Sequence, residues 1–383
     1  MPTRLYLDNA ATSYPKPDSV WDAMDRFNRE VGANPGRGPY GEAAEAGALV
    51  RQCREALAQL FGVRDPDRFV FGLNGTDMLN LAIKGSVGRG DHVITTALDH
   101  NSVMRPLNEL EARGVIEYTR LPGSPRGELD PARLEPEIRS NTRLIVAVHG
   151  SNVTGSLLPI EQLGRIARAN GVRFLVDACQ TAGCQPLNLS ALSVDLLACS
   201  GHKGLLGPMG TGVLYVADDV ELATVREGGT GSVSADDVQP SFLPDRFEAG
   251  TLNAGGIAGL LAGVRFLLEK GVHNVHAHKV KLVATFLEGV RSLPGVLAYG
   301  PSDPNRNAGV VSVSLRGLAP DEAARALDER HGIQVRPGLH CAPWAHRTLG
   351  TFPQGTVRFS FGYFNSVDQV QTAVRALGEL TAA

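Results

Sequence analysis

The chain has 383 residues, which at roughly 100–200 residues per domain predicts two domains, or one large domain with an appendage. Its 37 Lys and Arg nearly balance 40 Asp and Glu without a basic block, which argues against a nucleic-acid or anionic-membrane surface, and 43% hydrophobic residues exclude wholesale disorder. The five cysteines are odd in number and form no C-x-x-C pair, so we expect free thiols and a reducing cytoplasm.

The first two-thirds of the chain alternates strand and helix patterns. The N-terminus lacks the apolar stretch of a signal peptide. Apolar residues at helical spacing predict helices, and short β-branched or aliphatic runs predict strands. The predicted helices span 17–31, 42–61, 101–113 and 160–169, the last ending at Asn170-Gly171, and the predicted strands span 68–73, 92–97, 115–121, 143–148, 173–177, 196–200 and 210–216. Such alternation predicts an α/β fold with a large, mostly parallel sheet covered on both faces.

The pattern changes after about residue 255, where long helices lead into alternating strands. The apolar stretch 254–268 is shorter than a membrane span and contains Arg265, so it predicts a buried helix. The predicted helices span 254–269, 274–293, 320–330 and 367–380, the last with a capping box at Ser366–Gln369, and the predicted strands span 310–315 and 357–361. We therefore expect a large domain over 15–253 and a smaller α+β domain over 254–383, with segment 1–14 near the active site.

Two reactive side chains follow predicted strands directly. In open α/β sheets, ligands bind at the carboxyl ends of the strands. Lys203 follows the strand 196–200 between glycines, and Asp177 ends the strand 173–177. The alternative readings are a solvated loop lysine and an ordinary helix N-cap. A buried carboxylate needs a partner, which a protonated ring nitrogen would supply.

Two further strand ends carry groups suited to a phosphorylated ring. Gly75 and Thr76 begin a helix after the strand 68–73, where free N–H groups and a hydroxyl could bind phosphate, although an ordinary N-cap uses the same residue types. His100 follows the strand 92–97 and could stack on a planar ligand, or be a plain surface or core histidine. Together, these four elements describe a pocket for pyridoxal 5′-phosphate (PLP), bound by Lys203 as a Schiff base.

A separate loop near the C-terminus carries an exposed cysteine. Proline and glycine neighbours place Cys341 in a loop, and Arg336 and His340 beside it would favour its thiolate. The alternative is an incidental loop thiol. Arg358, inside the strand 357–361, is a candidate carboxylate clamp, the alternative being an arginine on a strand surface. The other four cysteines read as small inert hydrophobes, with two of them, Cys179 and Cys184, near the predicted pocket.

A series of motifs extends over essentially the whole chain. In order, they are Tyr6-Leu7-Asp8-Asn9-Ala10-Ala11-Thr12, Gly75-Thr76, His100, Ser151-Asn152-Val153-Thr154-Gly155, Asp177-Ala178-Cys179-Gln180, Ser200-Gly201-His202-Lys203, Phe247-Glu248-Ala249-Gly250-Thr251 and the segment from Arg336 through His340-Cys341-Ala342. This order resembles the class V aminotransferase-fold family of PLP enzymes, and within it the cysteine desulfurase and selenocysteine lyase group. The resemblance implies the PLP-dependent transferase fold type I and a homodimer.

The resemblance also implies a role for each site residue. Lys203, Cys341 and His100 would be catalytic: Lys203 would hold PLP and remove the α-proton of L-cysteine, and Cys341 would take the sulfur as a persulfide, leaving alanine. At the cofactor ring, Asp177 would pair with the pyridinium nitrogen, His100 would stack on the ring, and Asn152 and Gln180 would hydrogen-bond the phenolic oxygen. The expected phosphate contacts are Gly75, Thr76, Ser200 and His202. Thr251 would reach the phosphate of the partner subunit. On the substrate side, the resemblance implies Arg358 for the carboxylate, with Asn9, Ala10, Asn152 and Arg336.

Several alternatives stay open beside this reading, and no metal site is expected. Another PLP-dependent C–S lyase or an aminotransferase of the same fold would not need Cys341. A catalytically inactive scaffold is disfavoured because Lys203, Asp177 and Arg358 are all present. A dinucleotide-binding enzyme would need G-x-G-x-x-G after an early strand, and this sequence has no such run there. Leu339 stands where the related loop often has a second histidine. The short span from Cys341 to Arg358 suggests a sulfur-acceptor protein that activates turnover.

Overall fold

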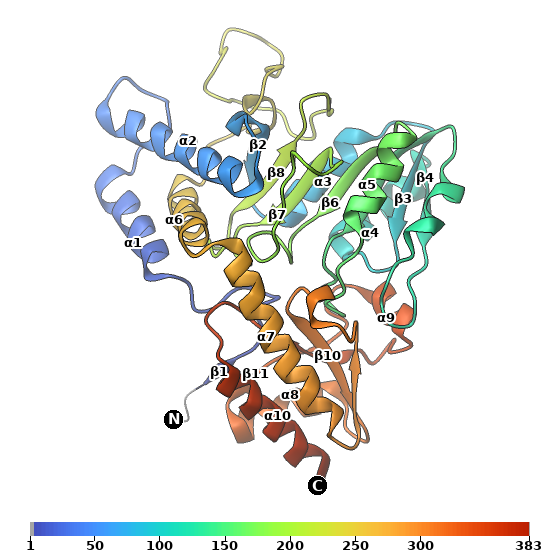
Figure 1. Cartoon of the computed structure of the whole chain (residues 1–383). Helices are drawn as coiled ribbons and strands as arrows, with labels where there is room; N and C mark the ends of the chain where they lie inside the picture. The colour runs from blue at the N-terminus through green and yellow to red at the C-terminus, as the bar shows by residue number, and fades with distance from the viewer. Residues whose placement is uncertain (1–3, 383) are drawn as a thin grey trace.

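The computed structural model describes residues 4–382, so residues 1–3 of the predicted segment 1–14 and residue 383 of the predicted small domain lie outside the described residues. Within this range the chain forms a seven-stranded sheet, a four-stranded antiparallel sheet and a short parallel pair (Figure 1). The short pair joins β1 (Leu5–Tyr6) to β11 (Ile333–Gln334) and so ties the N-terminal segment to the C-terminal part of the chain.

The large sheet has the strand order β2-β8-β7-β6-β5-β3-β4. Its strands are β2 (Phe69–Gly72), β3 (Asp91–Thr96), β4 (Ile116–Leu121), β5 (Thr142–Val148), β6 (Arg173–Asp177), β7 (Leu196–Ser200) and β8 (Gly212–Val216). Only β8 runs antiparallel to its neighbours, so the predicted mostly parallel sheet is confirmed. Because Val148 pairs with Asp177 and Asp177 with Ala198, the loops that follow β5, β6 and β7 emerge side by side.

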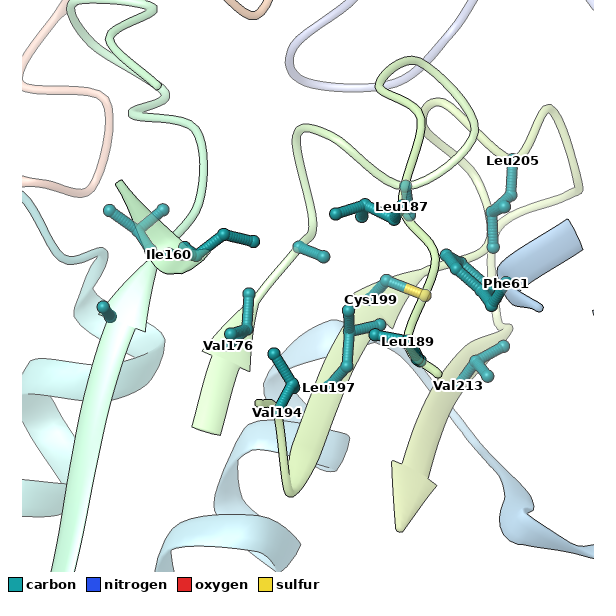
Figure 2. Close-up of a cluster of buried hydrophobic side chains, with 14 of the residues drawn as sticks. Phe61, Ile160, Val176, Leu187, Leu189, Val194, Leu197, Cys199, Leu205 and Val213 are labelled. Atoms are coloured by element: carbon teal, nitrogen blue, oxygen red, sulfur yellow. The ribbon is translucent and has the colours of Figure 1, made fainter. Parts of the chain in front are cut away.

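Helices cover both faces of this sheet. They are α1 (Asp18–Arg26), continued by a π-helical turn (Phe27–Val31), α2 (Gly41–Phe61), α3 (Gly75–Ser86), α4 (Asn101–Ala112), α5 (Ile160–Ala169) and α6 (Ala254–Lys270). One face packs on α2, α5 and α6 through a core that includes Phe61, Ile160 and Cys199 (Figure 2), and the other packs on α3 and α4. Burying one such aliphatic or aromatic side chain stabilises the fold by about 1.5–3 kcal/mol.

Helix α6 confirms the predicted buried helix. Residues from Ile257 to Leu267 belong to the same core as the large sheet, because the helix is apolar on nearly every side. We therefore propose that the boundary between the two parts lies at Gly271, after α6, instead of at 253/254. Across residues 4–382, no helix is long and apolar enough to cross a membrane.

The smaller part is an antiparallel sheet with the order β12-β13-β10-β9, packed on helices. Its elements are α7 (Val272–Arg291), β9 (Val296–Tyr299), β10 (Val310–Leu315), α8 (Pro320–His331), β12 (Arg336–Gly338), α9 (Pro343–Leu349), β13 (Thr356–Ser360) and α10 (Val367–Ala382). The core centres on Phe286, Phe359 and Phe361. The predicted capping box is confirmed, because the backbone N–H of Ser366 donates to Gln369 Oε1 (3.1 Å) and that of Gln369 to Ser366 Oγ (3.2 Å).

The sequence patterns missed the shortest elements. These are β1, β9, β11, β12 and α9, together with 3₁₀ turns at Pro66–Arg68, Pro131–Arg133, Glu135–Glu137, Asp245–Phe247 and Pro304–Arg306. A strand of two to four residues does not repeat the alternation by which strands are recognised, and a helix of two turns hardly repeats its apolar stripe. Their positions are decided by the elements they pair with.

Candidate active site

A cavity of about 320 Å³ opens where the loops after β5, β6 and β7 meet. Its volume is within the range of small-molecule sites, roughly 300–1,000 Å³. Every residue expected to bind the cofactor lines it, except Thr251: Gly75, Thr76, His100, Asn152, Asp177, Gln180, Ser200, His202 and Lys203. The structure thus brings together residues spread over more than a hundred positions of sequence.

Asp177 and Lys203 provide the opposite charges of the cavity. Asp177 is the buried last residue of β6, and its Oδ1 accepts a hydrogen bond from the Cys179 backbone N–H (2.9 Å). Among the described residues, no Lys, Arg or His side chain forms an ion pair with this carboxylate. Since a buried carboxylate is costly without a counter-charge, it suits a cationic ligand atom. Lys203 lies in the turn after β7 and is only partly exposed, which does not fit a solvated loop lysine.

His100 serves both as a helix cap and as a cavity wall. Its Nδ1 accepts a hydrogen bond from the backbone N–H of Ser102 (3.1 Å) at the start of α4, so the proton of the neutral ring is assigned to Nε2. Burial, opposed by the charge of Asp177 and assisted by the positive charges of Lys203 and Arg336, lowers the pKa of His100 to about 4. The ring is therefore neutral at neutral pH, and His100 lines the cavity.

The N-terminus of α3 forms one end of the cavity. A Cβ on Gly75 would lie 2.4 Å from Cys179 Sγ and 2.6 Å from Ser200 Oγ, so only glycine fits there. Within residues 4–382, the buried Nδ1 of His202 has no hydrogen-bond partner. Asp77, whose charge would oppose a phosphate, is turned aside: its Oδ2 accepts from the Leu73 backbone N–H (2.9 Å). Free helix N–H groups and an unpaired imidazole nitrogen make this end suited to a phosphate.

The N-terminal segment closes the cavity from another side. Gln180 Nε2 donates to the carbonyl oxygen of Ala10 (3.0 Å), and the Ser13 N–H donates to that of His202 (3.1 Å). The amide of Asn9 is occupied by the carbonyl oxygen of Ser360 (3.0 Å), so its role in this structure is to anchor the segment. Asn9 and Ala10 line a second, smaller cavity that Lys203 also borders.

Arg358 is not a strand-surface arginine, since its side chain is 1% exposed. Its Nη2 pairs with Asp8 Oδ1 (2.7 Å), and its Nη1 donates to the carbonyl oxygen of Asn152 (3.2 Å). Arg336 lies directly opposite Arg358 in the β12–β13 register and is more exposed. The two guanidinium groups form a cationic wall beside the cavity, suited to a carboxylate.

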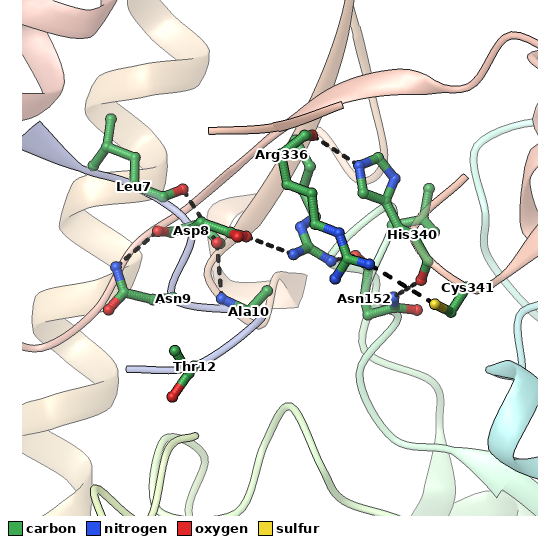
Figure 3. A network of polar contacts seen from close by, with 12 residues as sticks. Leu7, Asp8, Asn9, Ala10, Thr12, Asn152, Arg336, His340 and Cys341 are labelled. Carbon is green, nitrogen blue, oxygen red and sulfur yellow. Dashed lines mark hydrogen bonds and ion pairs between the residues drawn. The ribbon is translucent and has the colours of Figure 1, made fainter. Parts of the chain in front are cut away.

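Cys341 is the one exposed cysteine of the five. Its Sγ is 3.8 Å from Arg336 Nη2 (Figure 3). The Cys341 carbonyl oxygen accepts from the N–H of Asn101 (2.8 Å), next to His100, and the amide of Asn152 donates to the His340 carbonyl oxygen (2.7 Å). These two bonds fasten the cysteine loop to the wall of the cavity. The side-chain amide of Asn152 therefore donates its hydrogen bond to the cysteine loop.

One expectation for this loop is wrong. His340 was expected to add positive charge beside Cys341, but its side chain is 3% exposed and turned inward. Its Nε2 donates to the Arg336 carbonyl oxygen (2.9 Å), and its Nδ1 is 3.3 Å from Nε2 of His346. Burial lowers the pKa of His340 to about 2 and that of His346 to about 4, so both rings are neutral. The positive charge beside Cys341 comes from Arg336.

The loop also has unusual backbone geometry. His340 and Cys341 have φ angles of +51° and +57°, in the left-handed region that non-glycine residues seldom adopt. Such conformations persist where surrounding contacts enforce them. Here the buried His340 ring, with His346 and Thr351 behind it (His346 Nδ1 to Thr351 Oγ1, 2.8 Å), holds the turn that points Cys341 outward. No motif in the sequence signals this histidine pair.

The other cysteines are buried or enclosed. Burial raises the pKa of Cys53 to about 12 and also raises the pKa values of Cys179 and Cys199, so these three remain thiols. Cys179 borders the cavity, with its Sγ 3.5 Å from Ser200 Oγ. This supports the reading of these three as inert and of Cys341 as the reactive thiol.

Thr251 lies outside the cavity, exposed, in a loop close to Asn34. The loop is anchored by Glu248, whose carboxylate accepts from both Nη atoms of Arg54 (2.9 and 2.6 Å) and from the Phe71 N–H (2.6 Å). The expected contact of Thr251 with a partner subunit stays a prediction.

For residues 4–382, no group of three or more His, Cys, Asp or Glu side chains is arranged to hold a metal ion.

Sequence reasoning missed Asp99, a buried carboxylate directly before His100. It accepts hydrogen bonds from the N–H of Thr96 (2.7 Å) and of Val148 (2.8 Å) and from two threonine hydroxyls. It thereby joins the His100 turn to the end of β5. Burial and the charge of Asp177 raise its pKa to about 6, although the hydrogen bonds from Thr96 act in the opposite direction. The position of Asp99 directly before His100 is the sequence feature that could have identified it.

Comparisons with known proteins agree over nearly the full length. The model of the aminotransferase class-V family matches residues 5–372. Proteins described as probable cysteine desulfurases, from Methanothermobacter thermautotrophicus and Pyrococcus abyssi, are each 35% identical over 382 and 384 residues, covering 98% of this chain and 94% of theirs.

Solved structures of cysteine desulfurases have the same fold as this chain. One from Thermococcus onnurineus, in its apo form, matches with a TM-score of 0.93 and 36% identity, covering 99% of this chain and 95% of that chain. CsdA from Escherichia coli, a cysteine desulfurase, matches with a TM-score of 0.88 and 26% identity, with the same coverage. The fold expected from the sequence is therefore confirmed.

Proposed function

This chain belongs to the aminotransferase class-V family, and we propose that it is a PLP-dependent cysteine desulfurase, which converts L-cysteine to L-alanine and retains the sulfur as a persulfide on Cys341. The observation that supports this most directly is the exposed Cys341, fastened by Asn101 and Asn152 to the wall of the cavity that contains Lys203. A thiol in this position has no role in a simple elimination or transamination.

PLP fits the groups that line the cavity. The buried Asp177 carboxylate, which has no ion-pair partner among the described residues, suits a protonated pyridine nitrogen, and the neutral ring of His100 suits the flat face of the cofactor. The start of α3 at Gly75, with the unpaired Nδ1 of His202, suits the phosphate. Lys203 is the amine that would bind the aldehyde. When bound, PLP supplies an electron sink for the carbanion formed at the substrate α-carbon.

The chain's own residues then carry out the sulfur transfer. Arg358 and Arg336 would hold the substrate carboxylate, with Asn152 and the N-terminal segment at Asn9 and Ala10 bordering the substrate. The Lys203 amine would take the α-proton. Cys341 Sγ would attack the substrate sulfur: the new S–S bond forms while the Cβ–S bond breaks, and the electron pair left on Cβ takes up a proton. The return of a proton from the Lys203 ammonium group to the α-carbon would then complete alanine.

Arg336 has a second function in this scheme. Its guanidinium, 3.8 Å from Cys341 Sγ, stabilises the thiolate needed for attack, because an adjacent cation favours the charged form of a thiol. His340 supplies no charge and instead keeps the loop in its left-handed turn.

The test compares Cys341→Ser with the wild-type holoenzyme. The variant should keep the absorbance near about 420 nm expected for a PLP Schiff base and lose persulfide formation and sulfide release from L-cysteine. Lys203→Ala should lose the absorbance band as well. Undiminished sulfide release by Cys341→Ser would instead favour a C–S lyase. An identical spectrum for wild type and Lys203→Ala would refute the cofactor assignment.

Product analysis separates the remaining enzymatic alternatives. L-Cysteine and L-selenocysteine are offered in parallel, and alanine is measured against pyruvate plus ammonia. Alanine from both substrates would extend the proposal to a selenocysteine lyase, because both reactions use one site. Pyruvate would indicate elimination at the β-carbon, and a keto acid with transfer of the amino group would indicate an aminotransferase.

The proposal extends to assembly and surroundings. We expect a homodimer in which Thr251, held outward by the Glu248 anchor, reaches the phosphate site of the partner subunit. A reducing compartment such as the cytoplasm suits a chain whose five cysteines are all free, since Cys341 must be a thiol to accept sulfur. Because the cysteine loop is tied to the cavity wall, a sulfur-acceptor protein would have to approach Cys341 at the surface.

A further inference from the structure

Lys16 is a buried amine that contacts the turn in which Lys203 lies. It stands between the N-terminal segment and α1, and it is 7% exposed. An ammonium group has three N–H donors, and this one has three oxygen acceptors: the Ser13 carbonyl (3.0 Å), Ser13 Oγ (2.9 Å) and the His202 carbonyl (3.0 Å). Within residues 4–382, no Asp or Glu side chain forms an ion pair with Lys16. Its charge is therefore directed at neutral oxygens beside the active-site lysine.

The His202 carbonyl oxygen receives hydrogen bonds from three residues near the N-terminus. Besides Lys16, the Thr12 hydroxyl (3.1 Å), the Ser13 backbone N–H (3.1 Å) and the Ser13 hydroxyl (3.2 Å) donate to it. Because Ser13 Oγ accepts from Lys16 and donates to His202, these bonds form one network. A carbonyl oxygen has two lone pairs, so four donors exceed what the hydrogen bonding of this group requires.

The peptide bond held by these donors joins His202 to Lys203. Because this peptide is planar, its orientation sets the direction in which both side chains leave the backbone. The unpaired Nδ1 of His202 lies at the phosphate end of the cavity, and Lys203 lines the same cavity. The rest of the turn is held by its own backbone: the Leu206 N–H donates to the Lys203 carbonyl (2.9 Å) and the Gly207 N–H to the Gly201 carbonyl (2.9 Å).

We propose that Lys16 is a positioning residue for Lys203: its ammonium group, through the His202 carbonyl, sets the orientation from which the Lys203 amine reaches cofactor and substrate. Burial lowers the pKa of Lys16 to about 8, so the ammonium form predominates at neutral pH. This role rests on the proposed function, in which Lys203 binds PLP and takes the α-proton. It holds whether the Lys203 amine is bonded to the cofactor or free, because it concerns the backbone from which the side chain extends.

The experiment follows the α-proton step by itself. L-Alanine has an α-proton but no sulfur, so exchange of that proton in D₂O, measured by NMR, reports on the base without any contribution from Cys341. In the holoenzyme, Lys16→Met should exchange the proton at least tenfold more slowly than wild type, since a displacement of about 1 Å can cost roughly 10²-fold in rate. Lys281→Met removes an exposed lysine of α7 and should match wild type.

Comparing kcat with KM separates positioning from general damage to the site. In the desulfurase assay, Lys16→Met should lower kcat by a similar factor and leave the KM for L-cysteine within about twofold, because Arg358 and Arg336 lie on β13 and β12, outside the Lys16 network. If Lys16→Met does not fold, Thr12→Val still removes one donor from the same carbonyl at a partly exposed position. It should slow the exchange about threefold.

Exchange at the wild-type rate in both Lys16→Met and Thr12→Val would overturn the proposal, even if wild type releases sulfide. A KM that rises as much as kcat falls would also overturn it, because that pattern indicates a site distorted as a whole. A protein whose α-proton exchange depends on Lys16 but which releases no sulfide from L-cysteine would refute the desulfurase and leave the role of Lys16 intact.

Discussion

The buried histidine pair behind Cys341 leads to a quantitative prediction about acid stability. The pKa of His340 falls to about 2 and that of His346 to about 4, whereas histidines of the unfolded chain titrate near about 6.5. Below pH 6.5 the unfolded chain therefore binds protons that the native pair does not. Stability contributed by the pair is present above pH 6.5 and is lost as the pH falls towards about 4 for His346 and about 2 for His340.

The magnitude follows from proton linkage. One pH unit below the unfolded pKa, at pH 5.5, each neutral histidine lowers the free energy of unfolding by about 1.4 kcal/mol relative to pH 7.5, so the pair accounts for about 3 kcal/mol. The matched variant is His340→Gln/His346→Gln, which keeps polar side chains of similar size and removes both titrating groups. Other titrating residues contribute equally to both proteins.

The assay is urea unfolding of wild type and the double variant at pH 7.5 and pH 5.5. Between these two pH values, wild type should lose about 3 kcal/mol more than the variant. Equal pH dependence of the two proteins would refute the assignment of neutral, buried rings.

Three further predictions concern other parts of the site. Gly75→Ala should fold but bind PLP at least tenfold more weakly in an absorbance titration, because its Cβ would displace Cys179 Sγ and Ser200 Oγ at the phosphate end of the cavity; unchanged affinity would contradict the phosphate site at the start of α3. Glu248→Gln should lower the free energy of unfolding by about 3–5 kcal/mol in urea, since Arg54 is left buried and unpaired, and a loss below about 1 kcal/mol would count against that anchor. Arg336→Gln should slow iodoacetamide alkylation of Cys341 several-fold at pH 7 relative to wild type, and equal rates would exclude the guanidinium as the source of thiolate stabilisation.

Much of the cofactor cavity was predictable because it is built from strand ends. Each of Asp177, Lys203, His100 and Gly75 follows an apolar run, and the alternation of runs with helices dictates a parallel sheet whose carboxyl ends lie together. Position along the chain was thus enough to bring these side chains to one place. The long helices and strands were predictable for the same reason, since their apolar periodicity is a local property.

The partners of the side chains were not predictable from the sequence. Arg358 and Asp8 are 350 positions apart and become an ion pair only because the N-terminal segment runs along β13. His340 stands beside Cys341 in the sequence, yet its ring points away from the thiol, because the turn at positive φ sends successive side chains to opposite sides.

By itself, then, the sequence determined the α/β architecture and the strand-end residues of the cofactor cavity. It also distinguished Cys341, in its loop, from the other four cysteines. Tertiary structure alone decided which groups are charged, paired or turned inward: a neutral His340, an Arg358 already bonded to Asp8 and an Asn152 amide that holds the loop. The physical reason is that periodicity records burial along one element, whereas hydrogen bonds, desolvation and charge depend on residues that folding brings from elsewhere in the chain.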